Sequence, residues 1–335
     1  MKTAPPFFIV GCSRSGTTLL QVLLDAHPHI AIPPESLIFA HFAEIFDCYG
    51  DLGKESNLHA LVKDILDDER IKRWGLGISV AHFCERLRDF SVRGVIEHLF
   101  QLYAEKEGKT RWGDKTPEHV FFLKEIKTVF PEARLIHLVR DGRDVAESLM
   151  RVFFGPNTID RAALAWEKSV LTFREFKSHL KSTEYLEIHY ENLVRSPEQE
   201  LKKIFDFLGE EFLSFDERIP ETTSKAHYLQ YDTIHTSLKK SISGEKIGIF
   251  KSKLSQRQVE IFESIAGDLL ESYGYSRVTP ANRPILGYEK IRDGVVDQFF
   301  RFQLKIGKWS YLKERIQYHT RKWIRLRMRR TKSHV

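Results

Sequence analysis

Cysteine is scarce in this chain of 335 residues, and long apolar runs are missing. The three cysteines, Cys12, Cys48 and Cys84, lie far apart and form no C-x-x-C pair, which argues against a disulfide framework and against a zinc site. No apolar run approaches the roughly 20 residues that a transmembrane helix requires. The first run, Phe7–Val10, is too short for a signal peptide, so we expect a cytoplasmic protein.

Acidic residues are nearly missing from the last part of the chain. Residues 301–335 contain twelve Lys or Arg and only Glu314 against them, a net charge of +11. Because the whole chain carries +6, the other 300 residues carry −5. The basic character therefore belongs to one segment, and the rest of the chain is mildly acidic.

Strand and helix patterns alternate along the chain. The apolar run Phe7–Val10 meets a glycine loop and then a helical pattern from Thr17. Leu135–Val139 and Tyr185–Tyr190 are two further strands, each followed by a helix. This order predicts an α/β fold with a P-loop-type parallel β-sheet flanked by helices on both faces. A helical insert, about residues 36–111, follows the first strand and helix.

The first loop lacks the lysine of a nucleotide-triphosphate loop. Gly11 and Gly16 have the spacing of G-x-x-x-x-G-K-[ST], but Thr17 stands where the lysine should be. The cation of this loop is Arg14, which with its neighbouring hydroxyls can bind an oxyanion without a metal. Asp141, the best candidate for a magnesium-binding carboxylate, lies between arginines in R-D-G-R-D. We therefore expect two anion sites and no metal.

Three segments together resemble a known family. "VGCSRSGTTLLQVLLDAHP", "RLIHLVRDGRDVAESL" and "HYENLVRSPEQELKKIFDFLG" are similar to segments of the sulfotransferases that use 3′-phosphoadenosine 5′-phosphosulfate (PAPS). The likeness is to tyrosylprotein sulfotransferases and related bacterial members, whose loop carries R-S-G-T-T where cytosolic members carry K-S-G-T-T. The resemblance runs from about residue 7 to 275 and implies the P-loop-type fold and PAPS as the sulfuryl donor.

The resemblance also implies which residues bind the donor. Arg140 and Ser148 match the pair that binds the 3′-phosphate, and Tyr190 matches a tyrosine near the nucleotide. Taken alone, Ser148 is equally consistent with a solvated helix residue and Tyr190 with a core tyrosine. The loop that would hold the 5′-phosphosulfate comprises Arg14, Ser15, Gly16, Thr17 and Thr18.

A late segment matches the part of the family that folds over the nucleotide. Lys251 corresponds to the family lysine, but Phe250 stands where a tryptophan is usual. The hydroxyl expected some fourteen residues earlier is assigned to Ser237, with Thr236 and Ser241 as alternatives.

Two residues are the candidates for catalysis together with Arg14. Glu35 follows Arg14 by 21 residues, as the glutamate does in the tyrosylprotein enzymes, and a carboxylate can accept the proton of the attacking hydroxyl. Lys115 resembles the lysine that stabilises charge on the transferring group. A surface carboxylate and a solvated loop lysine are the alternative interpretations. Other branches of the family use histidine as the base. The alternatives to Glu35 are therefore His27, His119 and His137.

The resulting hypothesis is a PAPS-dependent sulfotransferase that transfers a sulfuryl group to an acceptor hydroxyl of a small molecule, lipid, glycolipid or tyrosine. The alternatives are a metal-dependent P-loop kinase and a non-catalytic membrane-surface protein that retains the fold. We expect a sulfotransferase domain at 1–285 and a basic, aromatic, helical extension at 286–335. That extension either binds an anionic membrane surface, which would make the protein peripheral, or docks on the domain. Nucleic acid is a weaker partner, because no recognition fold accompanies the charge.

Overall fold

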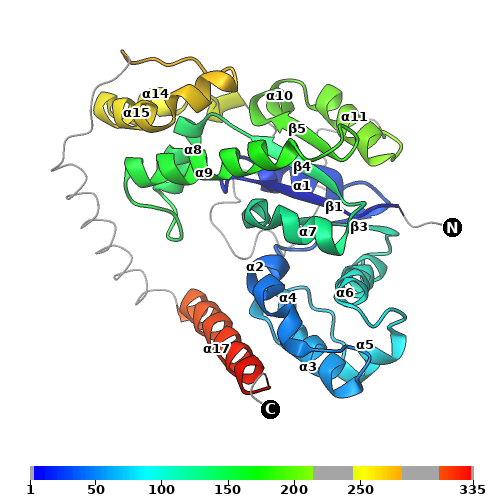
Figure 1. Cartoon of the computed structure of the whole chain (residues 1–335). Helices are drawn as coiled ribbons and strands as arrows, with labels where there is room; N and C mark the ends of the chain where they lie inside the picture. The colour runs from blue at the N-terminus through cyan, green and yellow to red at the C-terminus, as the bar shows by residue number, and fades with distance from the viewer. Residues whose placement is uncertain (1–3, 214–243, 281–308, 333–335) are drawn as a thin grey trace.

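The structure, a computed structural model, describes residues 4–213, 244–280 and 309–332 (Figure 1). Its strands are β1 Phe7–Gly11, β2 Ile30–Ala31, β3 Arg111–Lys115, β4 Arg134–Val139 and β5 Tyr185–His189. Its helices, with 3₁₀ segments marked η, are α1 Thr17–Asp25, α2 Ile38–Phe42, η1 Ala43–Tyr49, α3 Glu55–Leu66, α4 Glu69–Lys72, α5 Val80–Arg86, α6 Val92–Lys106, η2 Pro117–Phe122, α7 Leu123–Val129, α8 Gly142–Leu149, α9 Ile159–Lys177, α10 Tyr190–Arg195, α11 Pro197–Leu208, η4 Gly244–Lys246, α14 Phe250–Lys253, α15 Gln256–Ser272 and α17 Trp309–Lys332.

The five strands form one sheet in the order β2-β3-β1-β4-β5, and all neighbouring pairs are parallel. This arrangement confirms the predicted P-loop-type α/β fold. The two-residue strand β2 was not predicted, because it is too short to show a periodic pattern. Since parallel strands end at a common edge, the loops after β1, β3, β4 and β5 meet there.

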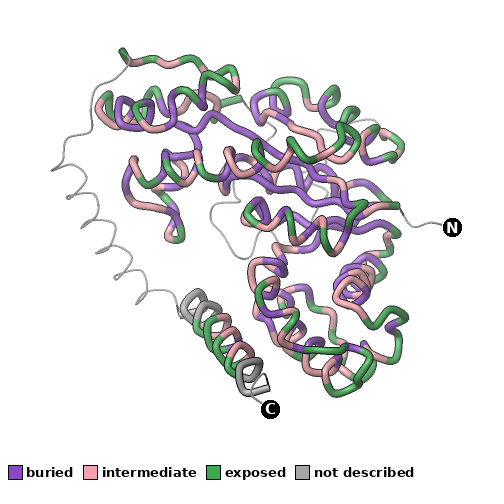
Figure 2. The backbone as a smooth tube through the Cα atoms, in the orientation of Figure 1, coloured by how far each residue is buried: buried purple, intermediate pink, exposed green. Residues whose placement is uncertain are grey.

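Strand β1 separates two hydrophobic cores. Figure 2 shows the central strands coloured almost entirely as buried. Phe8 and Val10 pack into a core shared with the helical insert, whereas Phe7 and Ile9 pack against α1 and α11 on the other face. Successive strand residues point to opposite faces, so an uninterrupted apolar run is what a strand covered on both sides requires. A third core joins α8, α9 and α15.

Helices α2 to α6 and segment η1 lie between β2 and β3, where the sequence predicted the helical insert. Gly75 and Gly77 adopt left-handed backbone angles, φ 60° and 61°, between α4 and α5. The last helix, α17, packs against η1 of the insert (Figure 1). The domain limits at 285 and 286 stay a prediction, because residues 281–308 lie outside the described ranges.

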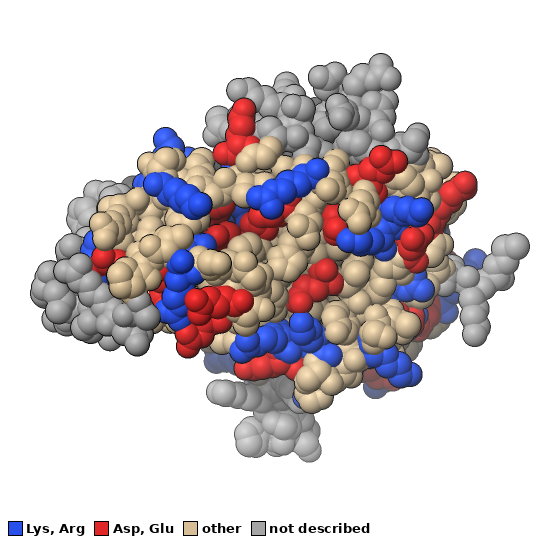
Figure 3. All heavy atoms as spheres, turned by 90° about the horizontal axis from the view of Figure 1, so that it is seen from above, with Lys and Arg blue, Asp and Glu red and all other residues tan. Residues whose placement is uncertain are grey.

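The face of the molecule seen in Figure 3 has mixed charge. Seen from above, Lys and Arg side chains lie among Asp and Glu side chains, without a large area of one sign (Figure 3). Among the described residues, the helices are either too short or too polar to span a bilayer.

Gly142, the first residue of α8, illustrates how tightly the third core is packed. A Cβ atom at this position would lie 2.6 Å from ring atoms of both Trp166 and Phe262. We expect Gly142→Ala to lower the free energy of unfolding by about 1–3 kcal/mol, the usual cost of overpacking. Urea unfolding followed by circular dichroism measures this change.

Gly244→Ala is the matched control for that substitution. Among the described residues, the nearest atom to a Cβ at Gly244 is 3.9 Å away, so this substitution should change the free energy of unfolding by less than about 0.5 kcal/mol. Equal effects of the two substitutions would contradict the packing argument.

Candidate active site

The loop between β1 and α1 is held in a strained, compact path. Gly11, Arg14 and Gly16 all have positive φ, at 148°, 75° and 98°. A Cβ atom at Gly11 would lie 2.6 Å from the carbonyl oxygen of Leu138, and one at Gly16 would overlap the ring of Tyr190. The two glycines are therefore required by close approach as well as by backbone conformation.

Arg14, Arg140 and Ser148 come together at this loop. Arg14 Nε donates to Ser148 Oγ at 3.0 Å, and Arg140 Nη1 donates to the Arg14 carbonyl oxygen at 3.3 Å. The guanidinium of Arg140 also lies over the Tyr190 ring, 4.5 Å from its centroid. The structure thus brings together Arg14, Arg140, Ser148 and Tyr190, which the family resemblance had assigned to the surroundings of one nucleotide.

Two buried polar atoms at the loop have no hydrogen-bond partner among the described residues: Ser15 Oγ and Arg140 Nε. Buried donors are normally satisfied, so unpaired ones mark a place where a ligand can bind. Lys246 lies in the same region, since Arg140 Nη2 donates to its carbonyl oxygen at 2.6 Å. Partial burial and then the charges of Arg140, Arg14 and Arg151 lower the pKa of Lys246. The cluster is cationic and suits a polyanion.

Asp144 hydrogen-bonds the segment that precedes Lys251 to the first turn of α8, next to this cluster. Its buried carboxylate accepts the backbone N–H groups of Gly248 at 2.7 Å and Phe250 at 2.9 Å. Lys251 follows directly and is exposed on α14, so the segment that was predicted to cover the nucleotide lies beside α8. Ser237, with the alternatives Thr236 and Ser241, lies outside the described residues.

Glu35 and Lys115 form an ion pair at the carboxyl end of β3. Lys115 is only 3% exposed, and its Nζ also lies 3.4 Å from the hydroxyl of Thr18 in α1. On its other oxygen, Glu35 meets Nη1 of Arg70 at 3.9 Å. One ammonium group therefore lies between the candidate base and the candidate donor loop.

A buried network fixes the backbone around Glu35. Thr116 Oγ1 donates to Asp114 Oδ1 at 3.2 Å and accepts the backbone N–H of Ser36 at 3.2 Å. Asp114 Oδ2 lies 2.7 Å from Nδ1 of His119, whose Nε2 accepts the N–H of Phe39 at 3.3 Å. The backbone at Ser36 and at Phe39 is thus hydrogen-bonded to side chains of the segment that follows Lys115.

The alternative histidines are all engaged elsewhere. His137 is fully buried in β4, 2.9 Å from Glu187 and stacked on Phe173, which is the environment of a core histidine. His27 lies beyond the far end of α1 and contacts the carbonyl oxygen of Glu211 at 3.2 Å. His119 belongs to the network described above. Their positions leave Glu35 as the candidate base with a cation beside it.

Glu118, Arg70 and Lys246 were not found from the sequence. Burial, followed by the charge of Glu35, raises the pKa of Glu118, and Ser13 Oγ lies 3.5 Å from its carboxylate. Glu118 follows Lys115 by three residues in "KTPE", which is the one local signal that could have indicated it. Arg70 and Lys246 reach the site from segments without a motif.

Comparison with known proteins identifies the family at this point. The model of a family described as "Sulfotransferase family" matches residues 5–214, well over half of the chain. The chain belongs to the sulfotransferase family. The sulfotransferase domain of the Synechococcus PCC 7002 olefin synthase has the same fold, with a TM-score of 0.51 and 26% identity over 79% of this chain and 95% of that domain.

Several relatives of this sulfotransferase-family chain are about one quarter identical to it. Nodulation protein NoeE of Sinorhizobium fredii is 24% identical over 81% of this chain and 66% of its own length. Protein-tyrosine sulfotransferase A of Caenorhabditis elegans is 24% identical over 62% and 50%. The omega-hydroxy-beta-dihydromenaquinone-9 sulfotransferase Stf3 of Mycobacterium bovis is 24% identical over 84% and 79%. The chain thus spans about half to two thirds of the first two relatives.

Cys12 in the loop offers a test of how tightly this site is packed. Burial, and then the charge of Glu118, raise the pKa of the Cys12 thiol to about 12, so the thiol stays protonated at neutral pH. At about pH 8 we expect iodoacetamide to modify Cys12 at least about 100-fold more slowly than the half-buried Cys48, because only the thiolate reacts. Mass spectrometry of peptides from the folded protein measures both rates.

The same labelling in urea is the control, since the two cysteines should then react alike. Rapid modification of Cys12 in the folded protein would contradict the buried environment of the loop.

Proposed function

We propose that this sulfotransferase-family chain transfers a sulfuryl group from PAPS to the hydroxyl group of an acceptor. The observation that carries the proposal is the position of Lys115, whose ammonium group contacts both the Glu35 carboxylate and Thr18 at the start of α1. A cation between a base and an anion-binding loop is what transfer of a charged group requires.

The residues of the site fit a nucleotide with phosphates at both ends. Arg14, Ser15 and Thr18 would hold the 5′-phosphosulfate, together with Gly16 and Thr17 of the same loop and the helix N-terminus. Arg140 and Ser148 would bind the 3′-phosphate. Ser15 Oγ and Arg140 Nε, which have no hydrogen-bond partner within residues 4–213, 244–280 and 309–332, support this assignment, as does the lowered pKa of Lys246. Tyr190, Lys251 and Ser237 are the further proposed contacts.

The chemistry is a displacement at sulfur. The acceptor oxygen forms a bond to sulfur while the bond from sulfur to the phosphate oxygen breaks, which releases adenosine 3′,5′-bisphosphate. The acceptor proton passes to Glu35, and Lys115 and Arg14 stabilise the negative charge that moves onto the leaving oxygen.

A metal-dependent kinase is not supported by the geometry around Asp141. The carboxylate of Asp141 accepts three hydrogen bonds from Arg143, at 2.9 Å from its N–H, 3.0 Å from Nε and 2.7 Å from Nη2. Asp141 also caps α8, so the sequence's best candidate for a magnesium ligand has a structural role. We propose that donor binding needs no metal.

The decisive experiment for the function is transfer from labelled PAPS into an extract of lipids and metabolites, with identification of the labelled product. Transfer that EDTA does not reduce is the expected result. Magnesium-dependent transfer from ATP would overturn the proposal, and tight donor binding without transfer would favour the non-catalytic alternative.

Arg140 allows a test of the donor site that does not need the acceptor. Arg140→Ala should weaken binding of adenosine 3′,5′-bisphosphate about 10- to 100-fold, because a charge-assisted hydrogen bond is lost. Isothermal titration calorimetry with EDTA present measures the affinity. Arg93→Ala, which removes a surface arginine paired with Glu132, is the matched control and should leave binding unchanged. Unchanged binding by Arg140→Ala would remove Arg140 from the donor site.

Glu35 allows a test of the base once an acceptor is known. Glu35→Gln keeps the size of the side chain but removes the base, so kcat should fall about 10²- to 10⁴-fold. The affinity for adenosine 3′,5′-bisphosphate should change little, since Glu35 is proposed to contact the acceptor. Steady-state kinetics and calorimetry measure the two quantities.

Two further variants make the Glu35 test specific. Glu55→Gln changes an exposed carboxylate of the insert, 85% exposed at its side chain, and should be without effect. Glu118→Gln changes the second carboxylate near Lys115. If Glu118→Gln abolished turnover while Glu35→Gln did not, Glu118 would be the base.

The proposed acceptor is a compound with a hydroxyl group: a small molecule, a lipid, a glycolipid or a tyrosine. The names of relatives include a protein-tyrosine sulfotransferase and a dihydromenaquinone sulfotransferase, each about equally similar to this chain. Acceptor selection would involve the helical insert, because Arg70 of α4 reaches Glu35 from that side. A cytoplasmic location remains part of the proposal.

A further inference from the structure

Helix α17 has one face fixed to the helical insert. Arg321 Nη1 lies 3.0 Å from Asp68, and Arg325 Nη2 lies 2.7 Å from Asp64. Tyr318 stacks on the ring of His41 with 5.2 Å between centroids. The sequence had left two alternatives for this segment, docking on the domain or binding a membrane, and for this face the structure shows docking.

The opposite face of the same helix carries exposed apolar side chains. Ile316 is 54% exposed, Trp323 is 59% exposed and Ile324 is 42% exposed. Within the described side chains of α17, residues 316–327, the exposed positions are spaced three and one apart, which defines a single helix face. We call this face, made by Ile316, His319, Thr320, Trp323, Ile324 and Arg327, the outer face.

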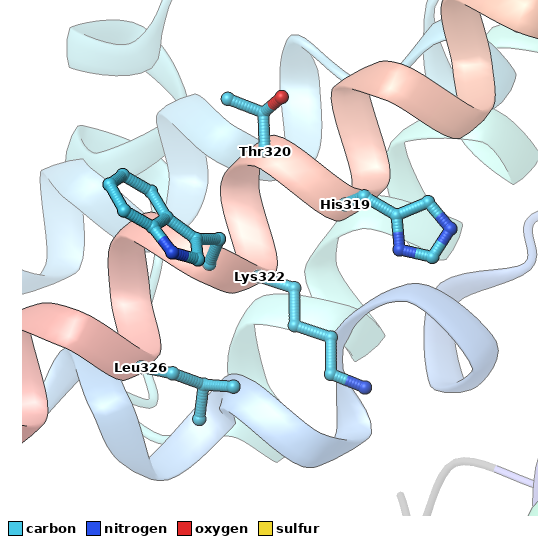
Figure 4. Close-up of a pocket in the computed structure, with 5 residues that line it drawn as sticks. His319, Thr320, Lys322 and Leu326 are labelled. Carbon is cyan, nitrogen blue, oxygen red and sulfur yellow. The ribbon is translucent and has the colours of Figure 1, made fainter.

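The outer face is hollowed beside Trp323. His319, Thr320, Lys322 and Leu326 line this shallow hollow with the indole ring (Figure 4). Lys322 reaches toward the neighbouring insert, where it pairs with Glu44, while Thr320 points away from it (Figure 4). The hollow therefore opens where the docked face ends, and its apolar lining is accessible.

The segment that contains α17 is strongly basic in sequence. Residues 301–335 contain twelve Lys or Arg, of which Arg321, Lys322 and Arg325 are paired with carboxylates of the insert. The sequence of the helix supplies further cations at 313, 315, 327, 329, 330 and 332 against Glu314. An apolar face with a tryptophan and an excess of cations is typical of helices that lie on anionic membranes.

We propose that the outer face of α17 binds the surface of an anionic lipid bilayer, with Ile316, Trp323 and Ile324 entering the interface. The docked face and the membrane face then belong to one helix, so the two alternatives from the sequence are compatible. The helix packs on α2, which begins three residues after Glu35, through His41 and Phe42. A bound membrane would therefore lie next to the insert, whose first helix begins shortly after the candidate base.

Sedimentation of the full chain with lipid vesicles tests the proposal without measuring turnover. We expect binding to vesicles of phosphatidylcholine mixed with phosphatidylglycerol, and at least about tenfold weaker binding to phosphatidylcholine alone or at high salt. The double variant Ile316→Ser/Trp323→Ser should reduce binding to the anionic vesicles at least about tenfold.

Phe90→Ser is the matched control, because Phe90 is 54% exposed on the insert but does not belong to the outer face. It should bind vesicles as the unaltered protein does. Circular dichroism and binding of adenosine 3′,5′-bisphosphate should be the same for all three proteins, which would show that the double variant folds.

Three results would overturn the proposal: no binding to anionic vesicles, equal binding to neutral ones, or equal losses in the control and the double variant. Sedimentation velocity tests whether a second copy of this chain, in place of a membrane, covers the outer face. A self-association that the double variant abolishes, without vesicle binding, would show that a second copy covers it.

Discussion

The contact between Tyr190 and Gly16 is the constraint on which the site depends. The tyrosine ring occupies the space that a side chain at position 16 would need, and Arg140 lies on that ring while bonding to the carbonyl of Arg14. One stack therefore joins the ends of β1, β4 and β5. Because the candidate anion-binding loop is held in its path by this contact, the directions of its arginine and hydroxyl groups are set by the fold itself.

A second constraint joins the insert to the sheet. Buried Asp114 organises Thr116 and His119, and these two residues hold the backbone N–H groups of Ser36 and Phe39. The backbone next to Glu35 is thus held in place by hydrogen bonds, and this fixes the position from which Glu35 reaches Lys115. Such a network explains how a residue from an inserted segment can act with one from the central sheet.

The sequence indicated those parts of the molecule that depend on local patterns. The apolar runs Phe7–Val10 and Leu135–Val139 are set by nearby residues, and the structure contains them as the strands β1 and β4. The positions of Arg70 and Lys246 depend on how distant segments pack, which no local pattern encodes. Glu35 was found only because its spacing resembles that of a family.

The docking of α17 shows why a strongly basic segment can belong to an acidic body. Burial alone would raise the pKa of Asp68, but hydrogen bonds from His41, the Arg70 amide and Arg321 lower it, so the carboxylate stays ionised at neutral pH. Since its folded-state pKa is depressed, this group stabilises the docked helix above its ordinary pKa and loses that effect as the pH falls through the lowered value. Asp68 also caps α4, whose Arg70 reaches Glu35. Asp68 therefore links the C-terminal helix α17 to α4, and α4 in turn contacts the candidate base Glu35 through Arg70.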